Sequence, residues 1–187
     1  MADWEIIDSS YVVRDRWLTL RADECRTADG VTVAPYYVFE YPDWVNVLAI
    51  TREAEIVVIR QYRHGIRRTV LELPGGAVDP GDDGVDAAVR RELLEETGYG
   101  IGTLTEIGCI GASPPNHTNR IHCFLARDAE PAGRPHPEST ETIRVETMSP
   151  AAVLDAAHRG EFEHPHHLAT IFFATAFPDV FPTRPVR

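Results

Sequence analysis

The pattern of apolar and polar positions along the 187 residues predicts a mixed α/β protein. Runs that alternate at period two, or that are rich in β-branched and aromatic residues, predict strands. The predicted strands are Trp17–Arg21, 31–40, Val45–Thr51, Ile56–Tyr62, Leu104–Gly111, Arg120–Ala126 and Thr142–Met148. Asp29-Gly30, between the first two, is typical of a hairpin turn. The uninterrupted apolar run from Ile56 to Ile59 suits a strand buried on both faces.

Helices are expected between and after these strands. They are predicted to end before Gly98, to run from Ser149-Pro150 to Gly160, and to lie around residues 167–177. In the first helix, Val85, Ala88 and Val89 recur at helical spacing, so this face should pack against the protein body. Strands mixed with helices in this order predict an α/β layer architecture with a mixed sheet.

Three carboxylates continue the apolar stripe of the first helix. Glu92, Glu95 and Glu96 stand at relative positions i, i+3 and i+4, which places them on one helical face. Like charges at this spacing repel one another, and buried carboxylates are costly unless they are paired or bound to a metal. The alternative is a solvated acidic helix with Arg90 and Arg91 as ion-pair partners. The preceding Pro-Gly-Gly turn and the terminal glycine favour the metal-binding interpretation.

The segment around these carboxylates resembles the signature of the Nudix hydrolases. The matching residues are Gly76, Arg91, Glu92, Leu93, Glu95, Glu96, Gly98 and Tyr99. The first glutamate of the signature is replaced by an aspartate, which is Asp82 counting from Gly76 or Asp83 counting back from Arg91. Tyr99 is a looser apolar match. Neither departure affects the three helix carboxylates that this family uses for metal.

The resemblance implies a Nudix-type αβα sandwich with a mixed sheet over residues 44–187. Residues 1–43 would then be an N-terminal β extension that packs against a partner subunit, which implies a homodimer. The run Gln61-Tyr62-Arg63 and the segment from Leu71 to Gly76 are similar to the ADP-ribose pyrophosphatase branch. That likeness implies hydrolysis of ADP-ribose to AMP and ribose 5-phosphate. Another nucleotide sugar, a dinucleotide, or a non-catalytic nucleotide-sensing module are the alternatives.

The same resemblance assigns roles to individual residues. Glu92, Glu95, Glu96 and the backbone of Gly75 would hold Mg²⁺ or Mn²⁺, which favour oxygen ligands. The catalytic set would be Glu95, Glu96, Arg91 as the residue that orients a carboxylate, and either Glu138 or Glu141 as the base or a further metal ligand. The substrate-binding set would be Arg63, Glu72 and Gly76.

A short histidine cluster and one loop remain without a firm role. His164, His166 and His167 have the types to bind a transition metal, although capping, surface or packing roles are commoner. Asn116, His117, Asn119 and Arg120 lie in or beside a loop between strands, where binding residues often occur.

Composition narrows the function classes. A net charge of −11 argues against a nucleic-acid surface, which needs dense Lys and Arg. No apolar run approaches the length of a membrane span, and residues 1–10 have no features of a secretion signal, so cytoplasmic location is expected. Cys25, Cys109 and Cys123 are widely spaced, which predicts reduced thiols rather than a disulfide framework or a zinc site.

Overall fold

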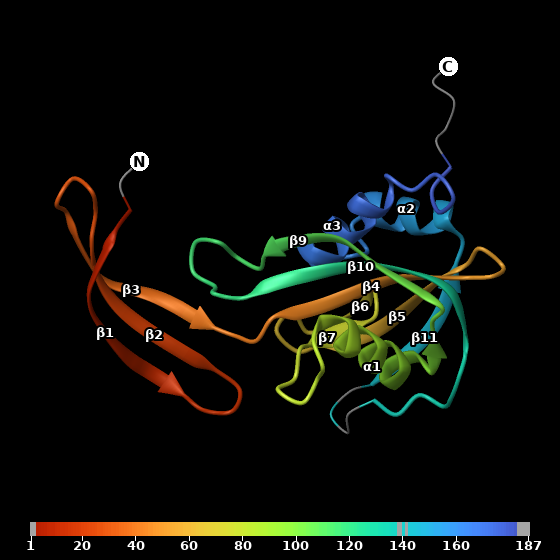
Figure 1. Cartoon of the computed structure of the whole chain (residues 1–187), viewed down its shortest axis with the longest axis horizontal. Coiled ribbons are helices and arrows are strands. Elements are labelled where there is room, and N and C mark those ends of the chain that lie inside the picture. Colours follow the sequence, from red (N-terminus) through yellow and green to blue (C-terminus); the bar gives the residue numbers. More distant parts are fainter. Residues whose placement is uncertain (1–2, 138–139, 141, 183–187) are drawn as a thin grey trace, which may run out of the picture. The chain divides into compact units, whose positions relative to one another are not determined.

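The computed structural model describes residues 3–137, 140 and 142–182 (Figure 1). Its strands are β1 (Glu5–Arg14), β2 (Thr19–Arg26), β3 (Thr32–Glu40), β4 (Trp44–Thr51), β5 (Ile56–Arg63), β6 (Arg68–Glu72), β7 (Gly75–Ala77), β8 (Tyr99–Gly100), β9 (Thr103–Gly111), β10 (Arg120–Pro131) and β11 (Ile143–Met148). Its helices are α1 (Val85–Thr97), α2 (Pro150–His158) and α3 (Pro165–Ala174).

The chain divides into two compact units. The first comprises Met1–Asp43 and Gly111–Arg120, and the second comprises Trp44–Ile110 and Ile121–Arg187. In the first unit, β1, β2 and β3 form an antiparallel sheet in that order. The predicted hairpin turn is confirmed, with the Gly30 N–H donating to the Thr27 carbonyl and Gly30 at a φ of 82°. Strand β2 begins two residues later than predicted and leaves Trp17 outside it, 69% exposed.

The second unit is built on a mixed sheet. The strand order is β11-β5-β4-β10-β8, with β6 paired to β5, β7 to β4 and β9 to β10. Strands β4 and β10 run parallel, whereas the pairings of β5 with β4, β6 and β11 are antiparallel. Helix α1 packs on one face, and α2 and α3 pack on the other (Figure 1). The predicted αβα sandwich is therefore confirmed.

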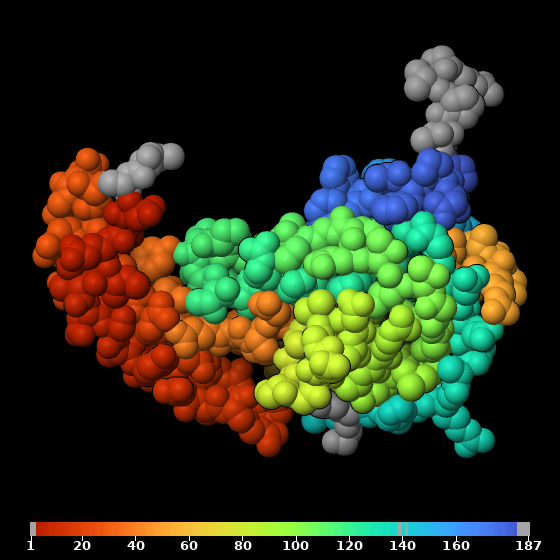
Figure 2. All heavy atoms as spheres, in the orientation of Figure 1, coloured from red at the N-terminus to blue at the C-terminus, as the bar shows by residue number. Residues whose placement is uncertain are grey.

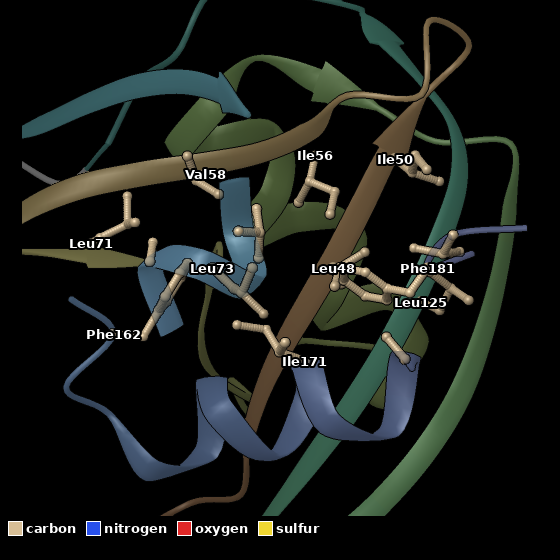
Figure 3. Packing of buried hydrophobic residues seen from close by; sticks show 14 residues of the cluster. Leu48, Ile50, Ile56, Val58, Leu71, Leu73, Leu125, Phe162, Ile171 and Phe181 are labelled. Atoms are coloured by element: carbon tan, nitrogen blue, oxygen red, sulfur yellow. The ribbon is translucent and has the colours of Figure 1, made fainter. Parts of the chain in front are cut away.

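The two faces of β4 belong to different hydrophobic clusters. Val45, Val47 and Ala49 pack with residues of α1, while Leu48 and Ile50 pack with α2 and α3 (Figure 3). Successive side chains on a strand point to opposite faces, so a strand covered on both sides is mostly apolar, and the buried polar residues of β4 are Asn46 and Thr51. The same reason explains β5, where all four residues of the predicted apolar run are buried.

Local signals define the helix ends. The Ser149 hydroxyl accepts a hydrogen bond from the Ala152 N–H at the start of α2, and Gly160 follows its end with a φ of 74°. Helix α3 begins at Pro165, which occupies the first turn, and ends three residues before the predicted position. No helix in the described part of the chain is long and apolar enough to cross a membrane.

The glycine pair before the helix differs from the prediction of a turn. Gly75–Ala77 forms the short strand β7, antiparallel to β4, with Gly76 opposite Val45 and Gly75 opposite Asn46. Pairing with a distant strand overrides the local turn preference of glycine, and a window of sequence contains no sign of that partner.

Candidate active site

Helix α1 presents its carboxylates on the side that packs against the sheet. Ala88 and Val89 are fully buried, Glu92 is half-buried and Glu96 is only 3% exposed. The helix ends at Gly98 in the left-handed conformation, with its N–H bonded to the Leu94 carbonyl. The predicted stripe is thus confirmed, and its last members are acids rather than apolar residues.

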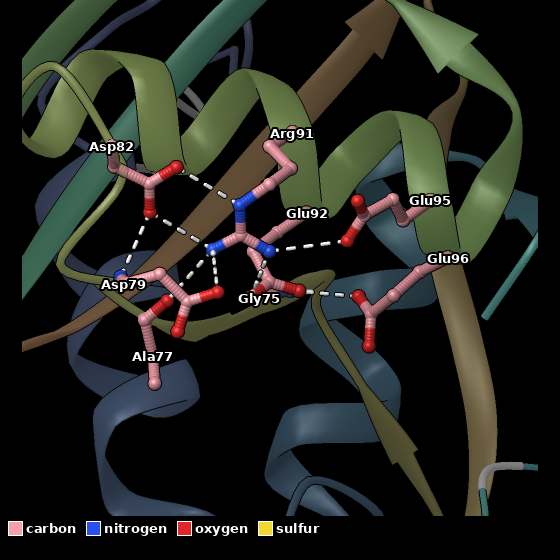
Figure 4. Close-up of polar contacts among 8 residues, drawn as sticks. All are labelled: Gly75, Ala77, Asp79, Asp82, Arg91, Glu92, Glu95 and Glu96. Atoms are coloured by element: carbon pink, nitrogen blue, oxygen red, sulfur yellow. Dashed lines mark hydrogen bonds and ion pairs between the residues drawn. The ribbon is translucent and has the colours of Figure 1, made fainter. Parts of the chain in front are cut away.

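Arg91 lies at the centre of a carboxylate network (Figure 4). Its Nη1 donates to Glu92 Oε1 at 2.9 Å and to Glu95 Oε2 at 3.1 Å. Its Nη2 also donates to the Ala77 carbonyl at 3.0 Å. A planar guanidinium with five donors can hold several acceptors at once, which suits the orienting role expected of this residue. Arg90, the other partner considered, donates instead to the Ile101 carbonyl at 3.2 Å.

The structure distinguishes between the two aspartates of the preceding loop. Asp82 accepts from Arg91 Nε and Nη2, both at 3.0 Å, and also from the Asp79 N–H at 2.8 Å. The hydrogen bonds from Arg91 lower the pKa of Asp82, and Asp82 in turn is the main cause of the raised pKa of Arg91. Asp83 is exposed. Asp82, rather than Asp83, is therefore the loop aspartate that pairs with Arg91.

Two glycines allow the strand and the acids to approach each other. A Cβ on Gly76 would lie 2.4 Å from Glu92 Oε1, and one on Gly75 would lie 2.2 Å from the Val45 carbonyl oxygen. The Gly75 N–H donates to Glu96 Oε2 at 2.9 Å. Any larger residue would displace either the paired strand or a carboxylate, so close packing requires both glycines, of which Gly76 also belongs to the signature.

The carboxylates of α1 are of the type that binds divalent cations. Glu92, Glu95 and Glu96 are oxygen donors on consecutive turns of one helix, and the cradle between β7 and α1 is too tight for a Cβ at Gly76. Negative charge also exceeds positive charge around Arg91, because Asp79, Asp82, Glu92 and Glu95 all lie within ion-pair distance of this single guanidinium. A divalent cation would neutralise the excess.

Glu72 and Arg63 form a separate pair. Arg63 donates through Nε and Nη2 to the two oxygens of Glu72, at 2.7 and 2.6 Å. Glu72 is 1% exposed, and His164 Nε2 lies 3.3 Å from its Oε1. Burial alone would raise the pKa of Glu72, but the hydrogen bonds from Arg63 and then His164 outweigh it and lower the pKa to about 2. The carboxyl is therefore ionised and neutralised by Arg63.

The three histidines gather beside this pair at the start of α3. The ring centroids of His164 and His166 are 4.8 Å apart, and those of His166 and His167 are 4.4 Å apart. Burial, followed by the nearby His164, lowers the pKa of His166 to about 4, and burial also lowers the pKa of His167 well below its ordinary value. Both rings are neutral at pH 7, so they pack as uncharged aromatic groups.

Other expected site residues lie elsewhere or outside the described residues. Glu138 and Glu141 are outside the described residues. Asn119 is buried and donates through Nδ2 to the Pro42 carbonyl, and the Arg120 N–H donates to Asp43 Oδ1. These two residues therefore stabilise the first unit, whatever else the loop does. The Ala77 carbonyl, which accepts from Arg91, was not among the predicted site residues, because the sequence contains no sign of a backbone acceptor.

The fold and this site are those of a known family. Residues 41–171 match the NUDIX domain, and the chain therefore belongs to this family. Residues 4–39 match the nucleoside diphosphate sugar hydrolase N-terminal domain. Members of the NUDIX family generally use divalent metal ions.

Individual relatives agree with this assignment. The chain is 37% identical to an ADP-ribose pyrophosphatase of Bacillus subtilis over 91 residues, which is 49% of each chain. The match thus spans about half the length of that relative. The chain is 32% identical over 162 residues to a GDP-mannose pyrophosphatase of Salmonella arizonae, covering 80% of this chain and 84% of that one. A crystal structure of an ADP compounds hydrolase has the same fold, with a TM-score of 0.84 over 95% of each chain at 22% identity.

Proposed function

We propose that the protein hydrolyses the diphosphate bond of a nucleoside diphosphate sugar in a magnesium-dependent reaction. ADP-ribose is the leading substrate, and addition of water across its diphosphate would give AMP and ribose 5-phosphate. The observation that carries the proposal is the excess of carboxylates around Arg91, held against the two glycines of β7. A diphosphate and its metal need this combination of negative ligands and close backbone approach.

In this proposal each residue of the network has a defined task. Glu92, Glu95, Glu96 and the backbone of Gly75 would hold the metal, which would polarise a phosphoryl oxygen and lower the pKa of a bound water. Arg91 keeps Glu92 and Glu95 in place through its two hydrogen bonds. Mn²⁺ could serve in place of Mg²⁺, because both ions accept carboxylate and water ligands.

The base and the substrate contacts complete the proposal. Glu138 or Glu141 would take the proton from the attacking water. Gly76 would let the diphosphate approach the backbone. Arg63 lines an open surface hollow together with His64, Gly65, Ile66, Glu163 and His164. Arg63 would therefore meet the substrate there while Glu72 holds its guanidinium.

A homodimer and a cytoplasmic location are also proposed. The sheet of the first unit exposes large apolar side chains, including Trp4, Ile6, Tyr11 and Val12, each about half exposed. Residues 1–43 would bury this surface against a partner subunit. All three cysteines are outside disulfides, in keeping with a reducing compartment.

The test is turnover of the purified protein with Mg²⁺ or Mn²⁺ on a panel of substrates. The panel contains ADP-ribose, GDP-mannose, UDP-glucose, NADH, diadenosine polyphosphates and nucleoside triphosphates, with products identified by chromatography. The proposal expects AMP and ribose 5-phosphate from ADP-ribose at the highest kcat/KM. Preference for GDP-mannose would keep the reaction and change the substrate. Tight binding of ADP-ribose without turnover on any compound would overturn catalysis in favour of a nucleotide sensor.

A further inference from the structure

A second group of side chains with metal-ligand chemistry lies on β9 and β10. These neighbouring strands run side by side in the sheet of the second unit (Figure 1). Glu106 and Cys109 come from β9, and His122 comes from β10. One carboxylate oxygen, the thiol sulfur and one imidazole nitrogen all lie within 4.8 Å of one another. None of these residues belongs to the carboxylate network of α1.

The three ligand atoms differ in kind. A thiolate, an imidazole and a carboxylate together are typical of Zn²⁺, whereas Mg²⁺ favours oxygen donors alone. The helix glutamates and this cluster therefore differ in the cations that they select. The wide spacing of the cysteines along the sequence predicted no zinc site. That spacing contains no information on a histidine and a glutamate that strand pairing brings beside Cys109.

Small shifts would bring the ligand atoms to the spacing that a tetrahedral zinc ion requires. Bond lengths of about 2.0–2.3 Å place neighbouring ligands roughly 3.3–3.6 Å apart. His122 Nδ1 and Glu106 Oε1 are 2.8 Å apart, so they would have to separate by about half an ångström. The Glu106 side chain is 42% exposed and can make this movement, while His122 is only 15% exposed and stays in place. Strand β9 lies at the surface on the face shown in Figure 2.

We propose that Glu106, Cys109 and His122 bind Zn²⁺ or a similar borderline-soft cation, with a water molecule as the fourth ligand. On binding, the Cys109 thiol loses its proton to solvent and the thiolate sulfur bonds to the metal. The His122 to Glu106 contact is replaced by two bonds to the same ion. The bound ion would tie β9 to β10, so it should raise the Tm of the protein.

The test uses Co²⁺ as a spectroscopic substitute for Zn²⁺ on the full-length protein. Saturating Mg²⁺ occupies the oxygen ligands of α1 throughout the titration. The expected result is one equivalent of Co²⁺ bound with a thiolate-to-metal charge-transfer band, which Zn²⁺ then abolishes. Cys109→Ser should remove the band, and Glu106→Gln and His122→Asn should weaken binding at least tenfold, because loss of even an outer-shell partner typically costs about 10–100-fold.

Two other cysteines supply matched controls. Cys25→Ser, in the first unit, and Cys123→Ser, whose buried thiol contacts Thr170, should both keep the band. The proposal is overturned if the wild-type protein gives no charge-transfer band, if Cys109→Ser retains it, or if either control loses it while remaining folded by circular dichroism. Since the Glu106 side chain is 42% exposed, Glu106→Gln should fold normally, and unchanged affinity in this variant would also overturn the proposed ligand set.

Discussion

Two arginines in the second unit each bind carboxylates, and the charge around them differs. Arg63 meets one buried acid, Glu72, and His166 and His167 beside that pair are held neutral, so Arg63 balances the charge of Glu72. Arg91 lies within ion-pair distance of four acids, and Glu96 is buried close by against Gly75. A balanced pair is complete without a further ion, whereas an excess of partly buried acid is stabilised by one. The comparison predicts that substitutions at α1 affect catalysis and that substitutions at Glu72 affect folding.

The largest effect is expected from Glu96→Gln. The amide can still accept the hydrogen bond from the Gly75 N–H, so the fold should remain, but one negative metal ligand is lost. Because metal catalysis contributes several kcal/mol, kcat should fall about 10²–10³-fold. Asp86→Asn, an exposed acid in the first turn of α1, is the matched control for charge and should keep kcat. Equal losses in the two variants would contradict a specific role for Glu96.

Glu72→Gln should lower the stability of the fold and leave kcat nearly unchanged. Removing the charge leaves Arg63 without its carboxylate, although that arginine is 36% exposed and is partly solvated. The free energy of unfolding should fall by about 2–3 kcal/mol in urea titrations. At saturating substrate kcat should stay within about threefold of wild type, and a raised KM would report contact of Arg63 with substrate. A hundredfold loss of kcat with normal stability would invert the comparison.

Acid should weaken the Glu72 region in two stages. The folded-state pKa of His166 is about 4, below its ordinary 6.5. As pH falls, the imidazole therefore takes up a proton in the unfolded chain before it does so in the folded protein. The stability of the fold decreases as pH drops from 6.5 to 4. The folded-state pKa of Glu72 is about 2, below its ordinary 4.5, so its stabilising contribution is lost as pH falls from 4.5 to 2.

Urea unfolding at pH 7 and pH 5 measures the first stage. The expected loss for the wild-type protein is about 1–2 kcal/mol from this histidine. His166→Gln has no titrating ring, so it should lose correspondingly less between the two pH values. An identical loss in both proteins would mean that other groups cause the acid sensitivity.

The smallest effect separates the two loop aspartates. Asp82→Asn weakens the paired hydrogen bonds to Arg91 and should cost about 1–2 kcal/mol of unfolding free energy. It should also raise the Mg²⁺ concentration needed for half-maximal turnover, because Arg91 then holds Glu92 and Glu95 less firmly. Asp83→Asn, at an exposed position, should stay within about 0.5 kcal/mol. Equal effects would show that the loop places no single aspartate against Arg91.

The sequence by itself determined what depends on short-range spacing. The glutamates share one helical face because their positions differ by three and four, and Gly98 ends that helix because glycine readily adopts the left-handed conformation. The burial of the central strand β5 followed from its unbroken apolar run, Ile56 to Ile59. These signals lie within one element, so no knowledge of its neighbours was needed.

Only the tertiary structure decided which residues meet across elements. It selected Asp82 over Asp83 as the partner of Arg91, converted the glycine turn into strand β7, and joined Arg63 to Glu72 beside the histidines of α3. It also brought Glu106 and Cys109 to His122 across two paired strands. Such contacts depend on strand register and on the packing of distant segments, neither of which is encoded in the spacing of residues along one element.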